Sequence, residues 1–172
     1  SVWFGGTDFK FAYDSGSDTT VHSSSTYEIN NWHHVVLTID SNRAGVLYVN
    51  GSSALTFSGA HNLGALDMFS IAMDYDITGE GLAGGPSDYF DGKIDEVAVW
   101  NDELTAAEVT AIYNSGNMLN VSSDSGNYAS AINLKGYYRF NEGSGTSLQD
   151  NSSNSNTGTI TGAAWTAGFV SE

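Results

Sequence analysis

Alternation of hydrophobic and polar positions is the dominant pattern along this chain. Phe9, Phe11 and Tyr13 alternate with polar or small residues, and the same period of two recurs in residues 33–39 and 69–73. A period of two places alternate side chains on one face of a strand, so each segment predicts a strand with one apolar face. Clusters of Gly, Ser, Asn, Asp and Thr separate these segments, which is typical of antiparallel strands joined by turns.

Two turns are predicted in the middle of the chain. Residues 40–45, Asp-Ser-Asn-Arg-Ala-Gly, separate the apolar residues 35–39 from residues 46–49, which predicts a hairpin. Asn50-Gly51 should turn the chain again. Many short strands of this kind predict an antiparallel β-sandwich.

One helix is predicted near residues 105–115. Thr105 and Glu108 stand three positions apart, which is the spacing of a capping box. Val109, Ile112 and Tyr113 form one apolar stripe, and Gly116 is expected to end the helix in a left-handed conformation. The expected fold class is therefore all-β, with one short α-helix.

Three segments have no strand period and are expected to be surface loops: residues 78–86, 114–131 and 143–157. The first contains the only proline of the chain, and it is a natural place for a binding surface. A plain flexible loop is the alternative for that segment.

Composition narrows the classes of function. The chain has 172 residues, 40% of them hydrophobic, which is enough for one sizeable core. Five Lys and Arg against twenty Asp and Glu give a net charge of −15, which would repel nucleic acid and anionic lipid. We therefore do not expect nucleic-acid binding. The absence of cysteine excludes disulfides, thiolate metal sites and cysteine nucleophiles. Since no apolar run reaches the ~18 residues of a membrane span, we do not expect membrane insertion either.

Four blocks of the sequence are similar to one known family. Trp-His-His-Val-Val at residues 32–36, Gly-Val-Leu-Tyr-Val-Asn-Gly at 45–51 and the strand and helix of 91–113 resemble the second half of a laminin-G-like domain of the concanavalin A-like lectin/glucanase superfamily. Residues 134–160, which include Gly-Tyr-Tyr-Arg-Phe-Asn-Glu-Gly-Ser-Gly-Thr, resemble its opening strands. The resemblance implies a jelly roll of two antiparallel sheets that binds glycans or protein surfaces, often with calcium, and it does not imply catalysis.

The block that opens the family comes last in this chain. We expect a single domain over residues 1–172, a circularly permuted sandwich in which residues 134–172 supply the closing strands. A truncated domain followed by the start of another, and a fragment of a longer chain, are the alternatives. The family's segment before its first long core strands has no counterpart, so N-terminal strands are expected to be missing.

Paired catalytic carboxylates are not expected. Retaining glycosidases need two carboxyl groups about 5–5.5 Å apart on one face. Asp95 and Glu96 are adjacent, so they should face opposite sides of a strand, and Asp102 and Glu103 fall in a turn. We therefore expect a domain that is not an enzyme.

Two groups of acidic and amide side chains are candidate calcium ligands, because Ca²⁺ binds six to eight oxygens. The first group lies on the loop that resembles the family's calcium-prone segment: Glu142, Asp150, Asn154 and Asn156. The second group flanks Pro86: Asp74, Asp76, Asp88 and Asp91. A solvated acidic rim is the alternative for both, since no spacing matches an EF-hand loop.

Aromatic side chains beside hydrogen-bonding groups are candidate sugar platforms, because pyranose rings stack on aromatic faces. The candidates are Tyr75, Tyr89 with its neighbour Asp88, and Trp3. Trp32, Trp100 and Trp165 lie in predicted strands and are expected in the core.

Three functions are consistent with these observations. The leading hypothesis is a non-catalytic extracellular recognition module that binds a glycan or a neighbouring protein subunit, with structural calcium. The second is a structural domain of a phage particle, at the virion surface, that packs against copies of itself as a homo-oligomer. The third is a carbohydrate-binding module of a polysaccharide-degrading enzyme.

Overall fold

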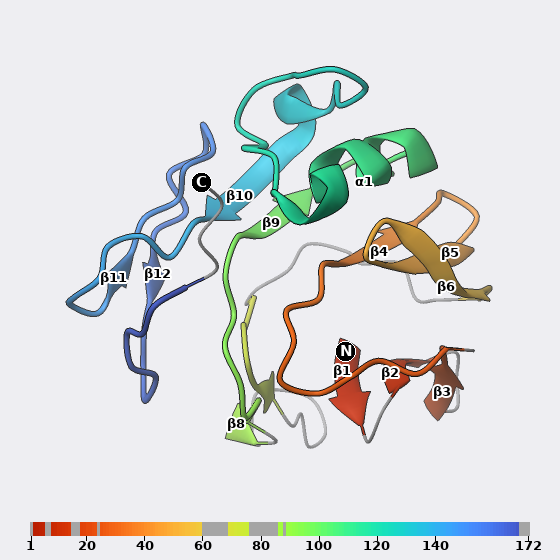
Figure 1. Cartoon of the computed structure of the whole chain (residues 1–172), viewed down its shortest axis with the longest axis horizontal. Coiled ribbons are helices and arrows are strands. Elements are labelled where there is room, and N and C mark those ends of the chain that lie inside the picture. Colours follow the sequence, from red (N-terminus) through yellow and green to blue (C-terminus); the bar gives the residue numbers. More distant parts are fainter. Residues whose placement is uncertain are drawn as a thin grey trace.

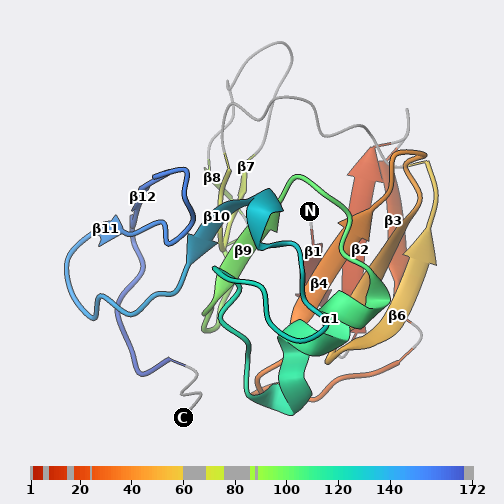
Figure 2. The same cartoon turned by 90° about the horizontal axis from the view of Figure 1, so that it is seen from above.

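The structure is a computed structural model that consists mainly of antiparallel β-strands. It describes the backbone of residues 2–5, 8–14, 18–23, 25–59, 69–75, 86–87 and 89–168, and the side chains of residues 23, 25–59, 69–73 and 89–168. Two three-stranded sheets are formed by β1 (Val2–Gly5), β2 (Asp8–Asp14) and β3 (Asp18–His22), and by β4 (Val35–Ile39), β5 (Gly45–Val49) and β6 (Ser52–Phe57). The second sheet lies over the first, as two views show (Figures 1 and 2).

Three further strand pairs extend the fold. They are β7 (Asp74–Tyr75) with β8 (Pro86–Ser87), β9 (Val97–Trp100) with β10 (Leu134–Tyr138), and β11 (Ser147–Leu148) with β12 (Gly158–Thr159). The helix α1 (Ala106–Tyr113) follows β9, and the 3₁₀ turns η1 (Asn114–Gly116) and η2 (Ala131–Asn133) lie between α1 and β10. In the part of the chain that the structure describes, no helix has the length and apolar character needed to cross a bilayer.

The two predicted turns are confirmed in the sheet of β4, β5 and β6, which we call the central sheet. Asp40 closes the turn between β4 and β5, because its Oδ1 accepts the backbone N–H groups of Asn42 and Ala44, both at 2.8 Å. Asn50 and Gly51 join β5 to β6 with φ angles of 50° and 76°. A two-residue hairpin turn requires such left-handed angles, which Asn and Gly tolerate best.

The helix begins as predicted and ends two residues before the predicted glycine. The capping box forms, with the Glu108 N–H donating to Thr105 Oγ1 at 3.3 Å and the Thr105 N–H donating to Glu108 Oε2 at 2.9 Å. The first left-handed residue is Asn114, with φ of 44°, rather than Gly116. Asn is the usual substitute for Gly at this position, so it ends the helix there.

The main core lies between α1, the central sheet and the β9–β10 pair. It contains buried side chains from all three and from the segments on either side of α1: Tyr48, Leu104, Val109, Ile112, Val121, Tyr128, Leu134 and Tyr137. Strand β5 is buried on both faces, because Leu47 and Val49 belong to a second cluster on the side opposite Tyr48. The short helix therefore serves as a cover for one end of the sandwich.

The strand predicted at residues 69–73 is wrong. These residues form bends, and only Asp74 and Tyr75 are extended, in β7. Ala72 has a left-handed φ of 67°, and its carbonyl accepts the N–H of the distant Phe90 at 2.9 Å. A left-handed residue cannot continue a regular strand.

The last block of the chain joins the middle block through β10. Strand β10 pairs antiparallel with β9, with Leu134 opposite Trp100 and Tyr138 opposite Val97. Glu96, which precedes β9 with φ of 53°, accepts hydrogen bonds from the Tyr137 hydroxyl and from Arg139 Nε. The pairing is the contact that a closing role for residues 134–172 requires, and the single permuted domain stays a prediction.

Candidate functional site

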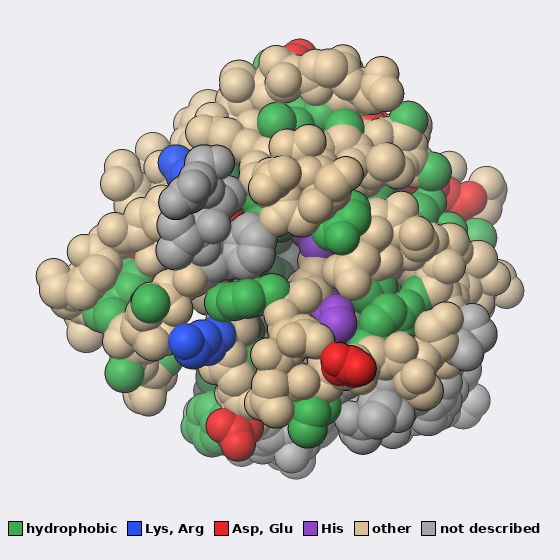
Figure 3. Space-filling view, viewed as in Figure 1, with side chains coloured by type: hydrophobic (Ala, Val, Ile, Leu, Met, Phe, Trp, Pro, Cys, Tyr) green, Lys and Arg blue, Asp and Glu red, His purple; other side chains and the backbone are tan. Residues whose placement is uncertain are grey.

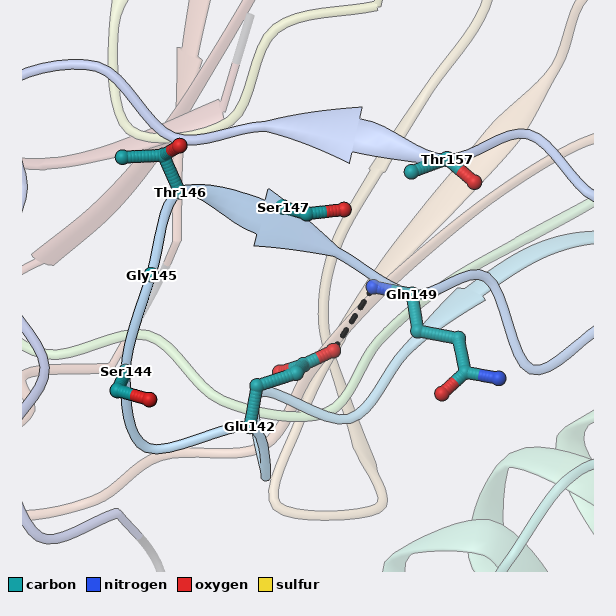
Figure 4. Close-up of a pocket in the computed structure, with 7 residues that line it drawn as sticks. All are labelled: Glu142, Ser144, Gly145, Thr146, Ser147, Gln149 and Thr157. Carbon is teal, nitrogen blue, oxygen red and sulfur yellow. Dashed lines mark hydrogen bonds between the residues drawn. The ribbon is translucent and has the colours of Figure 1, made fainter.

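An open hollow of about 530 Å³ lies on the β11–β12 hairpin. Seven residues line it: Glu142, Ser144, Gly145, Thr146, Ser147, Gln149 and Thr157. The hairpin projects from the side of the molecule away from α1 (Figure 1). The lining residues come from the loop before β11, from β11 and the residue after it, and from the residue before β12 (Figure 4).

Two glycines and one carboxylate shape the loop before β11. Gly143 and Gly145 have left-handed φ angles of 67° and 80°, which let residues 142–146 turn within a short span. Glu142 Oε1 then accepts the Gln149 N–H at 2.8 Å and ties the start of the loop to the end of β11 (Figure 4). Thr146 is fixed from the other strand, because the Ile160 N–H donates to its carbonyl at 2.8 Å.

The hollow presents polar groups that the protein itself leaves unused. Across the described residues, no hydrogen bond involves the hydroxyls of Ser144, Thr146, Ser147 and Thr157 or the side-chain amide of Gln149. Glu142 uses one carboxylate oxygen, and its Oε2 has no partner there. A hydroxyl both donates and accepts, an amide offers both on different atoms, and a carboxylate accepts. The lining can therefore exchange hydrogen bonds with a ligand rich in hydroxyl groups.

Trp165 lies beside the hollow. Its indole Nε1 donates to the Gly145 carbonyl at 2.8 Å, so the ring is held against the loop that forms one wall. The side chain is half-buried, in a segment without secondary structure, rather than part of the core clusters. An aromatic ring next to hydroxyl and amide groups is the arrangement that sugar binding uses.

The predicted calcium ligand Asp150 has protein donors on both carboxylate oxygens. Its Oδ1 accepts the N–H groups of Tyr137 at 2.9 Å and Ser152 at 2.8 Å, and its Oδ2 accepts the Ser152 hydroxyl and the Asn156 N–H, both at 2.8 Å. Burial alone would raise the pKa of Asp150, but these hydrogen bonds outweigh it and lower the pKa. The side chain is 8% exposed, so this carboxylate organises the loop from within.

Asn154 and Asn156 face the edge of β10 that β9 leaves unpaired. Their side-chain amides donate to the carbonyls of Leu134 at 2.9 Å and Lys135 at 2.8 Å. Asp150 and Asn156 are in direct contact through the Asn156 N–H, whereas Glu142 lines the hollow. Among the described residues, no three His, Asp or Glu side chains gather as a metal site would need. Structural calcium at this loop stays a prediction.

Three members of the second predicted calcium group and two of the three predicted sugar platforms fall where side chains are not described, whereas the fourth member, Asp91, is described and exposed. Asp74 and Tyr75 lie in β7 and Trp3 in β1, as backbone only, and Asp76 and Asp88 lie outside the described residues. Tyr89 is 67% exposed, which a sugar platform requires. It stays a candidate separate from the hollow.

Several large apolar side chains are exposed elsewhere. Trp32, expected in the core, is 40% exposed, and that expectation is wrong. The others are Ile29, Phe69, Phe90 and Ile132. Figure 3 shows exposed hydrophobic side chains between polar ones on one face of the molecule.

The sequence did not indicate the hollow. Ser144, Ser147, Gln149 and Thr157 are residue types too common in this chain to single out, and Trp165 was assigned to the core. The available signal was the Gly-Ser-Gly of residues 143–145, whose two glycines predict a tight turn.

Two solved structures are similar to this chain. One is a proposed carbohydrate binding protein from Bacteroides ovatus, with a TM-score of 0.62 and 18% identity over 96% of this chain and 44% of that chain. The other is an S-layer domain-containing protein from Clostridium thermocellum, with a TM-score of 0.44 and 23% identity over 62% of this chain and 51% of that chain. This chain thus spans less than half of the Bacteroides ovatus chain. No curated protein matches the sequence.

The first likeness is a likeness of fold, and it confirms the predicted antiparallel β-sandwich with one short helix. A laminin-G family model, described as the concanavalin A-like lectin/glucanases superfamily, matches residues 1–110. These residues are most of the chain, and they contain two of the four blocks that suggested the resemblance and all but the last three residues of a third. The chain belongs to the concanavalin A-like lectin/glucanases superfamily.

Proposed function

We propose that this chain is a non-catalytic glycan-binding module, and that the hollow on the β11–β12 hairpin holds one saccharide unit. The observation that carries the proposal is the set of unused hydroxyl, amide and carboxylate groups around an open hollow beside an indole ring. Sugar hydroxyls need such paired donors and acceptors, and sugar rings contribute C–H surface to an aromatic face. Membership of the superfamily supports this proposal.

Binding comes at little cost in buried polar groups. The lining hydroxyls are exposed to water in the free protein, so a sugar replaces water partners with equivalent ones. The two loop connections, Glu142 to Gln149 and Trp165 to Gly145, already hold the walls in place. A site fixed before binding loses less conformational freedom when the ligand enters.

A glycan array on the purified chain, followed by calorimetric titration of the best ligand, tests the proposal. Trp165→Ala should weaken binding about tenfold, because it removes the stacking surface. Gln149→Ala should weaken it by a few fold, because it removes one donor and one acceptor. Tyr89→Ala is the matched control, since it removes an exposed aromatic ring outside the hollow.

The control also decides between the two platforms. Loss of binding in Tyr89→Ala with full binding in Trp165→Ala would move the site to residue 89. Thermal melts of all variants show whether the fold survives. An array that stays empty, at any calcium concentration, would refute the proposal.

The cellular setting is part of the same proposal. We infer a place outside the cell, on a cell surface or a virion surface, because polysaccharides are found there. A carbohydrate-binding module within a polysaccharide-degrading enzyme would use the same hollow, and the sequence of the complete gene distinguishes it. Structural calcium belongs to this proposal as a separate prediction, tested below.

A second candidate function is assembly with copies of itself. The exposed side chains of Phe69, Phe90 and Ile132, the last of them 84% exposed, favour it, because apolar surface drives association. Sedimentation velocity over a hundredfold range of concentration tests this function. A single monomeric species throughout would argue against it, and a concentration-dependent shift would support a structural domain of a particle or fibre.

A further inference from the structure

The hollow contains one ionisable side chain and no cation. Glu142 is the single charged residue among the seven that line it, and the other side chains are hydroxyls and one amide. Lys and Arg number five in the whole chain. Two of these cations have contacts elsewhere, Arg139 with Glu96 and Lys93 with the Ala167 carbonyl. An anionic ligand would therefore meet a carboxylate, and no cation among the lining residues.

One hydrogen bond holds the exposed Glu142 side chain at the wall of the hollow. Its Oε1 accepts the Gln149 N–H at 2.8 Å, so the group stays at the wall of the hollow. Its Oε2 has no partner among the described residues. Figure 4 shows the carboxylate between the loop and the end of β11, with Ser144 on one side and Gln149 on the other. A held acceptor of this kind binds a hydroxyl or ammonium donor and repels a second carboxylate or a sulfate.

We infer that the hollow selects its ligand by charge: it favours a saccharide unit that is neutral or carries an ammonium group over uronic acid and sulfated units. This inference rests on the proposed function. The net charge of −15 acts in the same direction, because it lowers the local concentration of anionic glycans. The repulsion between two like charges at contact distance in water weakens binding about fivefold.

The test compares matched sugars on matched variants. For each neutral glycan that the chain retains, the amino and uronic acid forms of the same sugar are titrated against the native chain, Glu142→Gln and Glu103→Gln. Glutamine keeps the shape of Glu142 and can still accept the Gln149 N–H. Glu103 is an exposed acid before α1, away from the hairpin. Glu103→Gln therefore changes the net charge as Glu142→Gln does, without changing the hollow.

The native chain should bind the uronic acid form at least about fivefold more weakly than the neutral form. Glu142→Gln should bring the two within about twofold, and Glu103→Gln should leave the difference unchanged. High salt should shrink the difference in the native chain, because it screens the carboxylate. Equal binding of the uronic acid form by the native chain, or equal effects of the two variants, would overturn the inference while the glycan-binding function stands. Retention of no glycan of any charge would overturn the proposed function, and the inference with it.

Discussion

Replacing Glu108 with alanine should destabilise the fold more than any exposed acidic substitution. Glu108 is 7% exposed, and it connects three segments. Its Oε2 accepts the N–H and the hydroxyl of Thr105, both at 2.9 Å, and its Oε1 accepts the Ser130 hydroxyl and the Ala129 N–H, the latter at 3.3 Å. One side chain thus starts the helix and fixes the loop that returns to β10.

The magnitude follows from the donors that the substitution would leave without a partner. Loss of the capping box costs about 1 kcal/mol. Ser130 is buried, and stranding its hydroxyl and the Ala129 N–H costs about 1–3 kcal/mol each, less where water enters. We expect a loss of about 3–4 kcal/mol in the free energy of unfolding for Glu108→Ala, and about half of that for Glu108→Gln, which keeps one acceptor.

Urea denaturation followed by tryptophan fluorescence measures this loss, with Glu103→Ala as the control. Glu103 precedes the same helix and is exposed, so its removal should change the free energy of unfolding by less than about 0.5 kcal/mol. Burial would raise the pKa of Glu108, but the hydrogen bonds from Ser130, Thr105 and Ala129 outweigh it and lower the pKa. Its stabilisation is therefore present above the unfolded pKa of about 4.5 and is lost as the pH falls through the lower folded value. Equal effects of Glu108→Ala and Glu103→Ala would refute the reasoning.

Three further perturbations test other parts of the structure. Burial lowers the pKa of His34 from 6.5 to about 4, so the neutral ring is favoured in the fold. Its stabilisation is complete above pH 6.5 and is lost as the pH falls towards 4. The free energy of unfolding should fall by about 2 kcal/mol between pH 7 and pH 5, and His34→Gln should remove that part of the pH dependence. Asp150→Asn should lower the free energy of unfolding by about 3 kcal/mol in urea titrations, because an amide NH₂ would face N–H donors where a carboxylate accepted them; an unchanged midpoint would contradict the structural role of Asp150. If calcium binds, millimolar calcium should raise the Tm over an EDTA-treated sample by mass action; identical melts would exclude a structural calcium site.

The elements that the sequence predicted well are those fixed by local interactions. Two such elements are the capping box of Thr105 and Glu108 and the Asn50-Gly51 turn. Each depends on residues within a few positions of each other, so the sequence alone predicts it. The strand predicted at residues 69–73 does not form, because Ala72 is left-handed and contacts Phe90, eighteen positions away. Alternation alone does not reveal such a contact.

The candidate site was harder to predict for a related reason. Asp150, Asn154 and Asn156 have the residue types of a calcium loop, yet each of them also has a hydrogen bond to β10, which only the folded chain brings near. Trp165 has the residue type of a core side chain, but it follows the last strand and meets Gly145 across the hairpin. Composition identified the right loop without showing which of its atoms are already used.

The two asparagines that bond β10 from the loop between β11 and β12 make this strand edge sensitive to chemical ageing. Asn154 and Asn156 precede Ser155 and Thr157, and asparagine side chains hydrolyse slowly to aspartate in solution. At either position the product would place a carboxylate oxygen against a backbone carbonyl where an NH₂ group had donated. Chemical ageing would thus convert the cover of this strand edge into a repulsive contact, and an uncovered edge is where sheets from different molecules join. Old preparations of the protein should therefore aggregate from this edge first, and the mass gain of deamidation should precede the aggregates.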